Sequence, residues 1–109
     1  MPERILFVCT ANIDRSATAE DLLRGDDSFE VLSAGTWLHA RRKISRELLD
    51  WADKIFVMEE HHKDAVLDLK PDAENKIILL DIPDVYPKSH PELVKTLKAK
   101  LSKHLNIEW

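Results

Sequence analysis

Four short apolar runs, each followed by a segment with the spacing of a helix, constrain this chain more than any other feature. We expect strands at residues 4–9, 30–33, 54–58 and 76–80. Their nearly continuous apolar character is typical of parallel strands that are covered on both faces. We expect helices at residues 16–24, 45–51, 59–67 and 91–105. This alternation predicts an α/β fold, a small doubly wound domain whose four-stranded parallel sheet has the order 2-1-3-4 and helices on both faces.

Length and composition limit what such a domain can be. The 109 residues, 44% of them hydrophobic, suffice for one modest core, so we expect one domain over residues 1–109. No apolar run is long enough for a membrane span and no export leader is recognised, so we expect a cytoplasmic protein without a membrane partner. A net charge of −4 argues against a nucleic-acid partner. The single cysteine excludes an internal disulfide and a multi-cysteine zinc site.

That single cysteine, Cys9, ends the first expected strand, and Arg15 follows it at the start of a helix. Five intervening residues are enough to curl the backbone into a cup of inward-pointing amides, and such a nest at a helix N-terminus binds anions. A helix N-terminus also stabilises a thiolate. Arg15 offers a planar fork for two phosphate oxygens, and Ser16 is placed to hydrogen-bond the sulfur. The layout indicates nucleophilic catalysis through a thiophosphoryl-cysteine intermediate; the structural alternative is a buried cysteine that only packs.

Four blocks of the chain resemble, in the same order, the low-molecular-weight protein tyrosine phosphatase family, and in particular a short prokaryotic branch of it. The blocks are residues 9–16 (CTANIDRS) with Ala19 and Glu20, residues 33–36 (SAGT), residues 52–58 (ADKIFVM) and residues 82–86 (IPDVY). The resemblance implies a cysteine-dependent phosphomonoester hydrolase, a protein tyrosine phosphatase that needs no cofactor and no metal. Its implied substrate-binding residues are Thr10, Ala11, Asn12, Ile13, Asp14, Ser16 and Tyr86.

The leaving group of this reaction needs a proton donor, and Asp81 and Asp84 both follow the fourth expected strand. In a parallel sheet that edge also holds Cys9. The resemblance favours Asp84 as the acid of the first step and the base for water in the second. The alternative is that Asp84 is only a turn residue. Tyr86 and Trp37 are the candidates for the walls of an aromatic-substrate slot.

The loop departs from the family pattern at three positions. Ala11 replaces the usual glycine, Asp14 the second cysteine and Ala17 the proline. A carboxylate about 4 Å from a phosphate would cost about 1–4 kcal/mol, so we expect Asp14 to point outward into solvent. The acid loop also lacks the proline that usually follows its aspartate, and the segment at residues 36–46 is short.

Other functions stay open on these residues. A phosphate- or phosphopeptide-binding module without turnover is favoured by Ala11 and Asp14. A phosphocarrier would explain Cys9 but neither Arg15 nor Asp84. Arsenate reduction would require an external thiol, because the chain has no second cysteine.

The remaining expectations concern metal and partners. His61 and His62 are neighbours on an expected helix and therefore face different ways, so we expect no metal site there. The expected substrate is a phosphorylated protein or a small aryl phosphate, and the expected state is a monomer or a weak homodimer.

Overall fold

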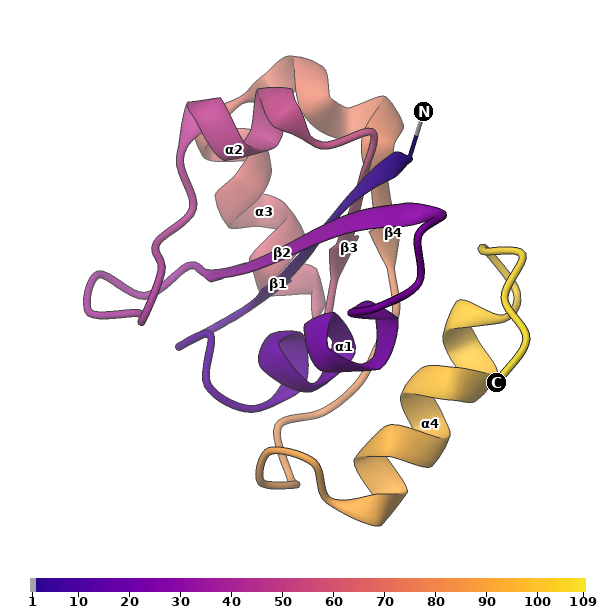
Figure 1. The fold of residues 1–109 in the computed structure, drawn as a ribbon. Coiled ribbons are helices and arrows are strands. Elements are labelled where there is room, and N and C mark those ends of the chain that lie inside the picture. The colour runs from indigo at the N-terminus through magenta and orange to yellow at the C-terminus, as the bar shows by residue number, and fades with distance from the viewer. Residues whose placement is uncertain (1) are drawn as a thin grey trace.

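The computed structural model describes residues 2–109, which form a four-stranded parallel sheet with helices on both faces (Figure 1). The strands are β1 (Glu3–Cys9), β2 (Phe29–Gly35), β3 (Lys54–Val57) and β4 (Ile77–Leu79), in the spatial order β2-β1-β3-β4. Phe7 of β1 lies opposite Ser33 of β2 and Phe56 of β3. The predicted fold class and strand order are confirmed.

Two helices cover each face of the sheet. On one face lie α1 (Arg15–Leu23) and α4 (Pro91–Leu101), and on the other α2 (Arg46–Trp51) and α3 (Glu60–Leu69), followed by the 3-10 turn η1 (Pro71–Lys76) (Figure 1). Side chains of β1 alternate between these faces: Phe7 packs with the α1 and α4 leucines, whereas Val8 packs with Leu49 and Val66 of α2 and α3. Both faces of β1 are therefore buried, as expected of a central parallel strand.

Element boundaries differ from the expected ones mainly at the end of the last helix. α4 ends at Leu101, not at residue 105, because residues 102–104 turn out of the helix. The Ser102 hydroxyl donates to the Lys98 carbonyl, which competes with regular helical geometry. Leu105 still packs into the core at 5% exposure, so the i+4 leucine spacing identified a buried residue beyond the helix.

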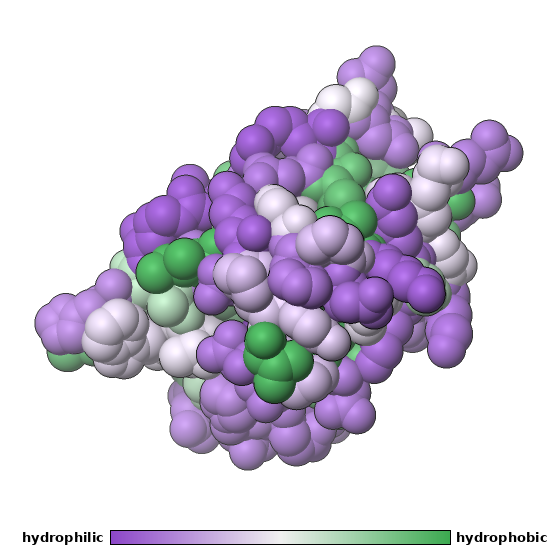
Figure 2. Space-filling view, turned by 90° about the horizontal axis from the view of Figure 1, so that it is seen from below, coloured by the Kyte–Doolittle hydropathy of each residue, from purple (hydrophilic) through white to green (hydrophobic). Residues whose placement is uncertain are grey.

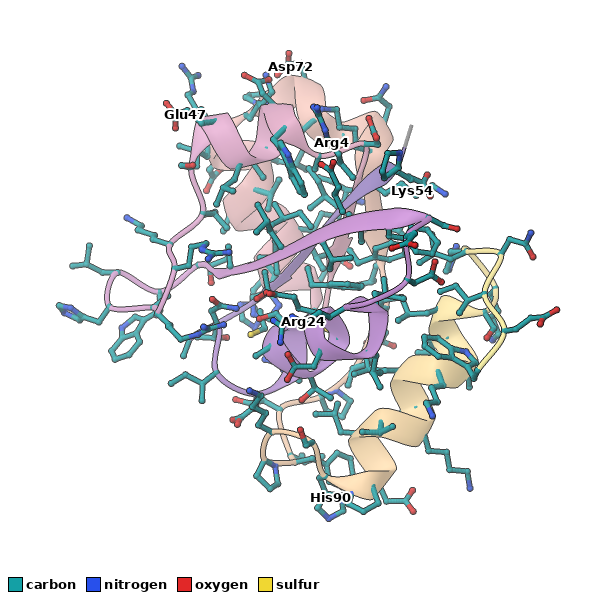
Figure 3. The ribbon with its side chains drawn as sticks, in the orientation of Figure 1. Arg4, Arg24, Glu47, Lys54, Asp72 and His90 are labelled. Atoms are coloured by element: carbon teal, nitrogen blue, oxygen red, sulfur yellow. The ribbon has the colours of Figure 1, made fainter. Side chains whose placement is uncertain are left out.

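The two edges of the sheet differ in chemistry. The N-terminal ends of the strands carry exposed ion pairs such as Lys54 with Glu3 at 3.0 Å, near Arg4 (Figure 3). Pairs of this kind contribute little to stability. At the C-terminal ends, Cys9 is the last residue of β1, and residues 81–89, here called the acid segment, follow β4. Within residues 2–109, no helix has the length and apolar character needed to cross a membrane.

Candidate active site

A pocket of about 120 Å³ lies at the C-terminal edge of the sheet. Its walls are formed by Cys9, Thr10, Ala11, Ile13, Asp14, Arg15 and Asp84. Loop residues and an aspartate far along the chain thus meet at one place, as their shared position at the strand ends predicted. A larger hollow of about 520 Å³ lies between residues 43–47 and α3, but no cysteine lines it, so we assign the chemistry to the smaller pocket.

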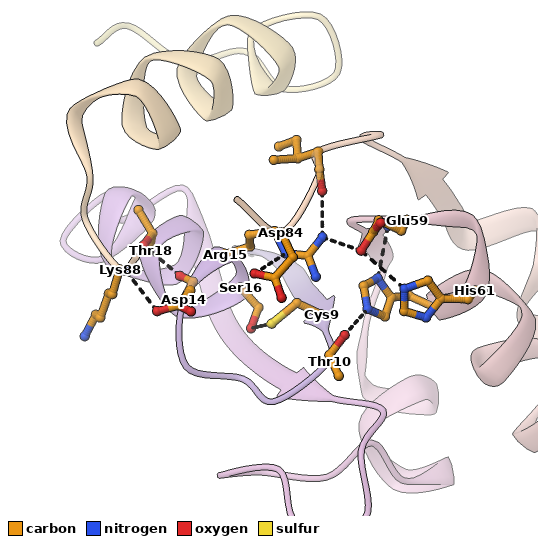
Figure 4. A network of polar contacts seen from close by, with 12 residues as sticks. Cys9, Thr10, Asp14, Arg15, Ser16, Thr18, Glu59, His61, Asp84 and Lys88 are labelled. Carbon is orange, nitrogen blue, oxygen red and sulfur yellow. Dashed lines mark hydrogen bonds and ion pairs between the residues drawn. The ribbon is translucent and has the colours of Figure 1, made fainter. Parts of the chain in front are cut away.

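The sulfur of Cys9 lies at one end of a buried hydrogen-bonded network, of which Figure 4 shows the contact with Ser16. Cys9 Sγ lies 2.9 Å from Ser16 Oγ. The Asn12 side-chain amide donates to Ser16 Oγ at 2.8 Å and to Ser33 Oγ at 2.7 Å, and Ser33 in turn donates to Glu20. The Ser16 hydroxyl can accept from Asn12 and still offer its own hydrogen to the sulfur. The network thus holds a hydrogen-bonding hydroxyl against Cys9.

Asn12 fixes the shape of the loop as well as the direction of this network. Its φ of +58° lies in the left-handed region, which asparagine tolerates better than most residues. Its buried Oδ1 has no hydrogen-bond partner within residues 2–109, which costs about 1–3 kcal/mol. Gly35, from the SAGT block, lies against the loop, and a Cβ there would collide with the Thr10 carbonyl oxygen. The loop therefore keeps costly features that stability alone does not require.

Arg15 is 1% exposed, and one of its nitrogens is already committed. Nη1 donates to Glu59 Oε2 at 2.7 Å and to the Ile82 carbonyl at 2.6 Å. That anchoring leaves the Nε–Nη2 edge of the fork for an oxyanion, and Nε lies 3.9 Å from Asp84 Oδ1. The hydrogen bond from Arg15 lowers the pKa of Glu59, against an opposing effect of burial. Glu59 was not predicted as a site residue, although it follows the end of β3 by two positions and therefore lies at the same sheet edge as Arg15.

His62, also missed as a site residue, supports the loop from α3. Its ring is fully buried; Nδ1 accepts from the Glu59 backbone N–H at 3.0 Å, and Nε2 lies 2.9 Å from Thr10 Oγ1. Since Nδ1 accepts, the ring proton is on Nε2 and is donated to Thr10. Burial, aided by the charges of His61 and Arg15, lowers the pKa of His62 to about 4. The imidazole is therefore neutral at pH 7.

Glu59, His61 and His62 place three potential metal-ligand atoms within 4.8 Å of one another. The Glu59 carboxylate, however, binds Arg15 and lies 3.2 Å from His61, and both nitrogens of His62 are engaged with the protein. These contacts of the cluster support the loop through Arg15 and Thr10.

The expectation that Asp14 points outward into solvent is wrong, because its carboxylate binds another part of the chain. Its Oδ1 accepts the backbone N–H of Lys88 at 2.9 Å (Figure 4). The carboxylate is thus turned toward the acid segment.

The two aromatic residues expected to wall the pocket do not line it. The Tyr86 ring stacks on His90 with 4.8 Å between ring centroids and packs against the core, and Trp37 lies edge-on to His39. Tyr86, in the acid segment, buries its apolar ring area in this packing and not over the pocket. The apolar contact at the mouth comes instead from Ile13, which is 54% exposed. Seen from below, the surface has separate hydrophobic residues among hydrophilic ones (Figure 2).

Comparisons with known proteins show which family the chain belongs to. No family model matches the chain. A protein-arginine-phosphatase of Geobacillus stearothermophilus is 30% identical over 99% of both chains. The low molecular weight protein-tyrosine-phosphatase Wzb of Salmonella typhi is 34% identical over 89% of this chain and 87% of Wzb.

Solved structures of such proteins share the fold. The tyrosine phosphatase Wzb from Escherichia coli K30, in complex with phosphate, superposes with a TM-score of 0.79 and 27% identity over 94% of this chain and 96% of Wzb. The YwlE arginine phosphatase from Geobacillus stearothermophilus superposes with a TM-score of 0.74 and 28% identity over 96% of this chain and 94% of YwlE. The chain therefore belongs to the low-molecular-weight protein tyrosine phosphatase family.

Proposed function

We propose that this protein is a cysteine-dependent protein tyrosine phosphatase that acts on phosphorylated proteins in the cytoplasm. The observation that carries the proposal is the meeting of a hydrogen-bonded cysteine, a buried arginine and an exposed aspartate, namely Cys9, Arg15 and Asp84, in one pocket. Relatives named as tyrosine and arginine phosphatases over most of the chain support it. A free thiol nucleophile suits the reducing cytoplasm.

In the first step the phosphoryl group lies in the loop, held by backbone amides and by the Nε–Nη2 edge of Arg15. The Cys9 thiolate attacks phosphorus while the ester P–O bond breaks. Asp84, whose side chain is 59% exposed at the mouth, gives its proton to the leaving oxygen. The products are the free hydroxyl of the substrate and thiophosphoryl-Cys9.

In the second step Asp84, now a carboxylate, takes a proton from water as the water oxygen attacks phosphorus. The P–S bond breaks, and the Ser16 hydroxyl, 2.9 Å from the sulfur, stabilises the departing thiolate. Inorganic phosphate leaves, and the enzyme returns to its starting protonation.

Ile13 supports an aryl substrate over phosphoarginine. Its half-exposed apolar side chain lines the pocket and offers a face to an aromatic ring, whereas a guanidinium group gains less from such a contact. Phosphoarginine remains the second candidate, because Asp14 and Asp84 place carboxylates at the same mouth.

The test is hydrolysis of a phosphotyrosine peptide, a phosphoarginine peptide and an aryl phosphate in the presence of EDTA, by wild type and by Cys9→Ser. We expect metal-independent turnover of the tyrosine and aryl substrates, lost in Cys9→Ser while vanadate still binds. Turnover that survives in Cys9→Ser would exclude the thiophosphoryl route. Preference for phosphoarginine would reassign the substrate, and vanadate binding without any turnover would indicate a binding module.

A further inference from the structure

We propose that Asp14 is a positioning residue that holds the acid segment, and with it Asp84, over the pocket. The inference rests on the proposed function, since it assigns Asp14 to the step in which Asp84 transfers a proton. It concerns a position at which this chain departs from the usual residue of its family.

The acid segment joins β4 to α4 without regular secondary structure and is fixed near each end. At its start, the buried residue Ile82 donates its N–H to the Met58 carbonyl at 2.8 Å and accepts from Arg15 Nη1 at 2.6 Å. This first anchor thus ties the segment to the core and to Arg15.

The second anchor lies near the end of the segment and is made of polar groups. Lys88 N–H donates to Asp14 Oδ1 at 2.9 Å, and Ser89 N–H donates to Thr18 Oγ1 at 2.9 Å. The Thr18 hydroxyl donates in turn to the Asp14 carbonyl at 2.7 Å (Figure 4). A salt bridge of 3.3 Å between Lys88 Nζ and Asp21 adds a weaker contact. The Asp14 side chain thus accepts the first backbone tie directly, and its backbone carbonyl supports the second through Thr18.

Between the anchors Tyr86 packs against the core, but Asp84 itself has little support. Within residues 2–109, the side chain of Asp84 has one polar contact, 3.9 Å from Arg15 Nε, and Val85 beside it is 64% exposed. The place of the Asp84 carboxylate is therefore set by the two anchors and not by packing of its own side chain.

The Asp14 side chain is free for this role because it does not cap its own helix. It occupies the N-cap position of α1, where an aspartate usually accepts a hydrogen bond from the first turn, yet it makes no such bond. Its carboxylate is instead aimed across to Lys88. A carboxylate accepts a backbone N–H strongly, whereas the sulfur of the family's usual cysteine is a weak acceptor.

Loss of the tie between the Asp14 side chain and Lys88 should affect the proton transfers of Asp84, and kcat/KM isolates proton donation in the first step. Displacement of a catalytic group by about 1 Å can cost on the order of 100-fold in rate. We therefore expect Asp14→Ala to lower kcat/KM, which reports the first step, about 10- to 100-fold for phenyl phosphate and phosphotyrosine peptide, whose leaving groups need a proton. For an activated ester such as a dinitrophenyl phosphate, kcat/KM should stay within about twofold of wild type.

Three variants make the test specific. Asp14→Asn keeps an oxygen acceptor for Lys88 without the charge and should restore most of the rate for poor leaving groups. Asp84→Asn should show the same leaving-group dependence as Asp14→Ala, and the double variant should lose little more, because both changes remove one function. Asp27→Ala, an exposed aspartate remote from the pocket walls, is the control and should behave as wild type.

Each result decides the matter. An equal loss for all leaving groups in Asp14→Ala, or independent losses in the double variant, would overturn the positioning role while leaving the phosphatase intact. Failure of Asp14→Asn to recover would show that charge, not the hydrogen bond, is what matters, and would overturn it too. A wild type that hydrolyses nothing would instead remove the proposed function, and this inference with it. Thermal unfolding followed by circular dichroism identifies any variant that fails to fold.

Discussion

The floor of the pocket and the acid segment hold their polar groups in different ways. The floor is here Cys9 and Arg15, which line the pocket, with the buried Asn12 and Ser16 of the same loop. Each floor residue is at most 3% exposed, and its polar side chain is held by hydrogen bonds to the protein, as in the pair of Arg15 with Glu59. The acid segment places Asp84, the proposed acid, in solvent, 59% exposed, between two anchored ends.

The difference fits the two tasks of a phosphatase. Transition-state charge on phosphorus is best stabilised by donors that are already oriented and shielded from water, which is what the floor provides. The acid must meet leaving groups of different size that enter from solvent, which an exposed carboxylate on a short tethered span permits. Rigidity is thus concentrated where charge develops, and adaptability where the substrate varies.

The largest effect should come from breaking the floor at Arg15. In Arg15→Lys the ammonium cannot both keep the Glu59 contact and hold two phosphate oxygens, because it lacks the planar fork. We expect kcat/KM for aryl phosphate to fall by about 10²–10³, the usual cost of a lost transition-state donor. The measurement is steady-state kinetics together with vanadate affinity.

Arg42→Lys, at an exposed position outside the pocket lining, is the matched control and should match wild type. A loss below tenfold in Arg15→Lys would mean that the backbone amides of the loop, and not the guanidinium, provide most of the charge stabilisation.

A second, smaller effect concerns pH and the support of the floor by His62. The folded-state pKa of about 4 lies below the ordinary value of 6.5, so between these values the unfolded chain binds a proton that the folded protein does not. Stability is therefore full above about pH 6.5 and falls as pH drops toward 4, by about 3 kcal/mol in total. Urea unfolding at a series of pH values measures this.

In His62→Gln the slope of stability over this pH range should be much reduced, while stability at pH 7 drops because the glutamine fits the two hydrogen bonds less well. His39→Gln, at an exposed loop position, should leave the slope intact. An unchanged slope in His62→Gln would assign the pH dependence to other groups.

Much of the floor could be predicted from the sequence, because its residues are contiguous and follow a recognisable strand. Asn12 illustrates this: a loop of this length between strand and helix favours a residue that tolerates positive φ, and the structure has φ +58° there. The position of Asp84 in the pocket could be predicted from topology, because parallel strands end at a common edge of the sheet.

The supports of the site could not be predicted in the same way. The contacts of Glu59 with Arg15 and of His62 with Thr10 depend on how α3 starts relative to β1, and apolar periodicity does not set that geometry. Tyr86 shows the opposite error, because an aromatic residue near a pocket can equally well pack on its neighbours, here His90. Side-chain direction, more than element type, separates the correct predictions from the wrong ones.

The smallest expected effect tests backbone freedom on both sides of the pocket. Ala11 replaces the family's usual glycine, but it is not among the non-glycine residues with positive φ, which are Asn12, Asp81 and Ser89. Ala11→Gly should therefore lower the free energy of unfolding by about 0.4–1 kcal/mol, through a more flexible unfolded chain, and leave kcat within about twofold.

The matched change in the acid segment is Ser89→Gly, where φ is +63° and a side chain is strained. Glycine relieves that strain, so this variant should be neutral or slightly more stable, opposite in sign to Ala11→Gly. Urea unfolding of both variants at pH 7 gives the two values side by side. If Ala11→Gly stabilised the protein or raised kcat several-fold, the alanine would be a defect of the loop. The contrast between a floor that already fits its backbone and a segment that holds strain would then be wrong.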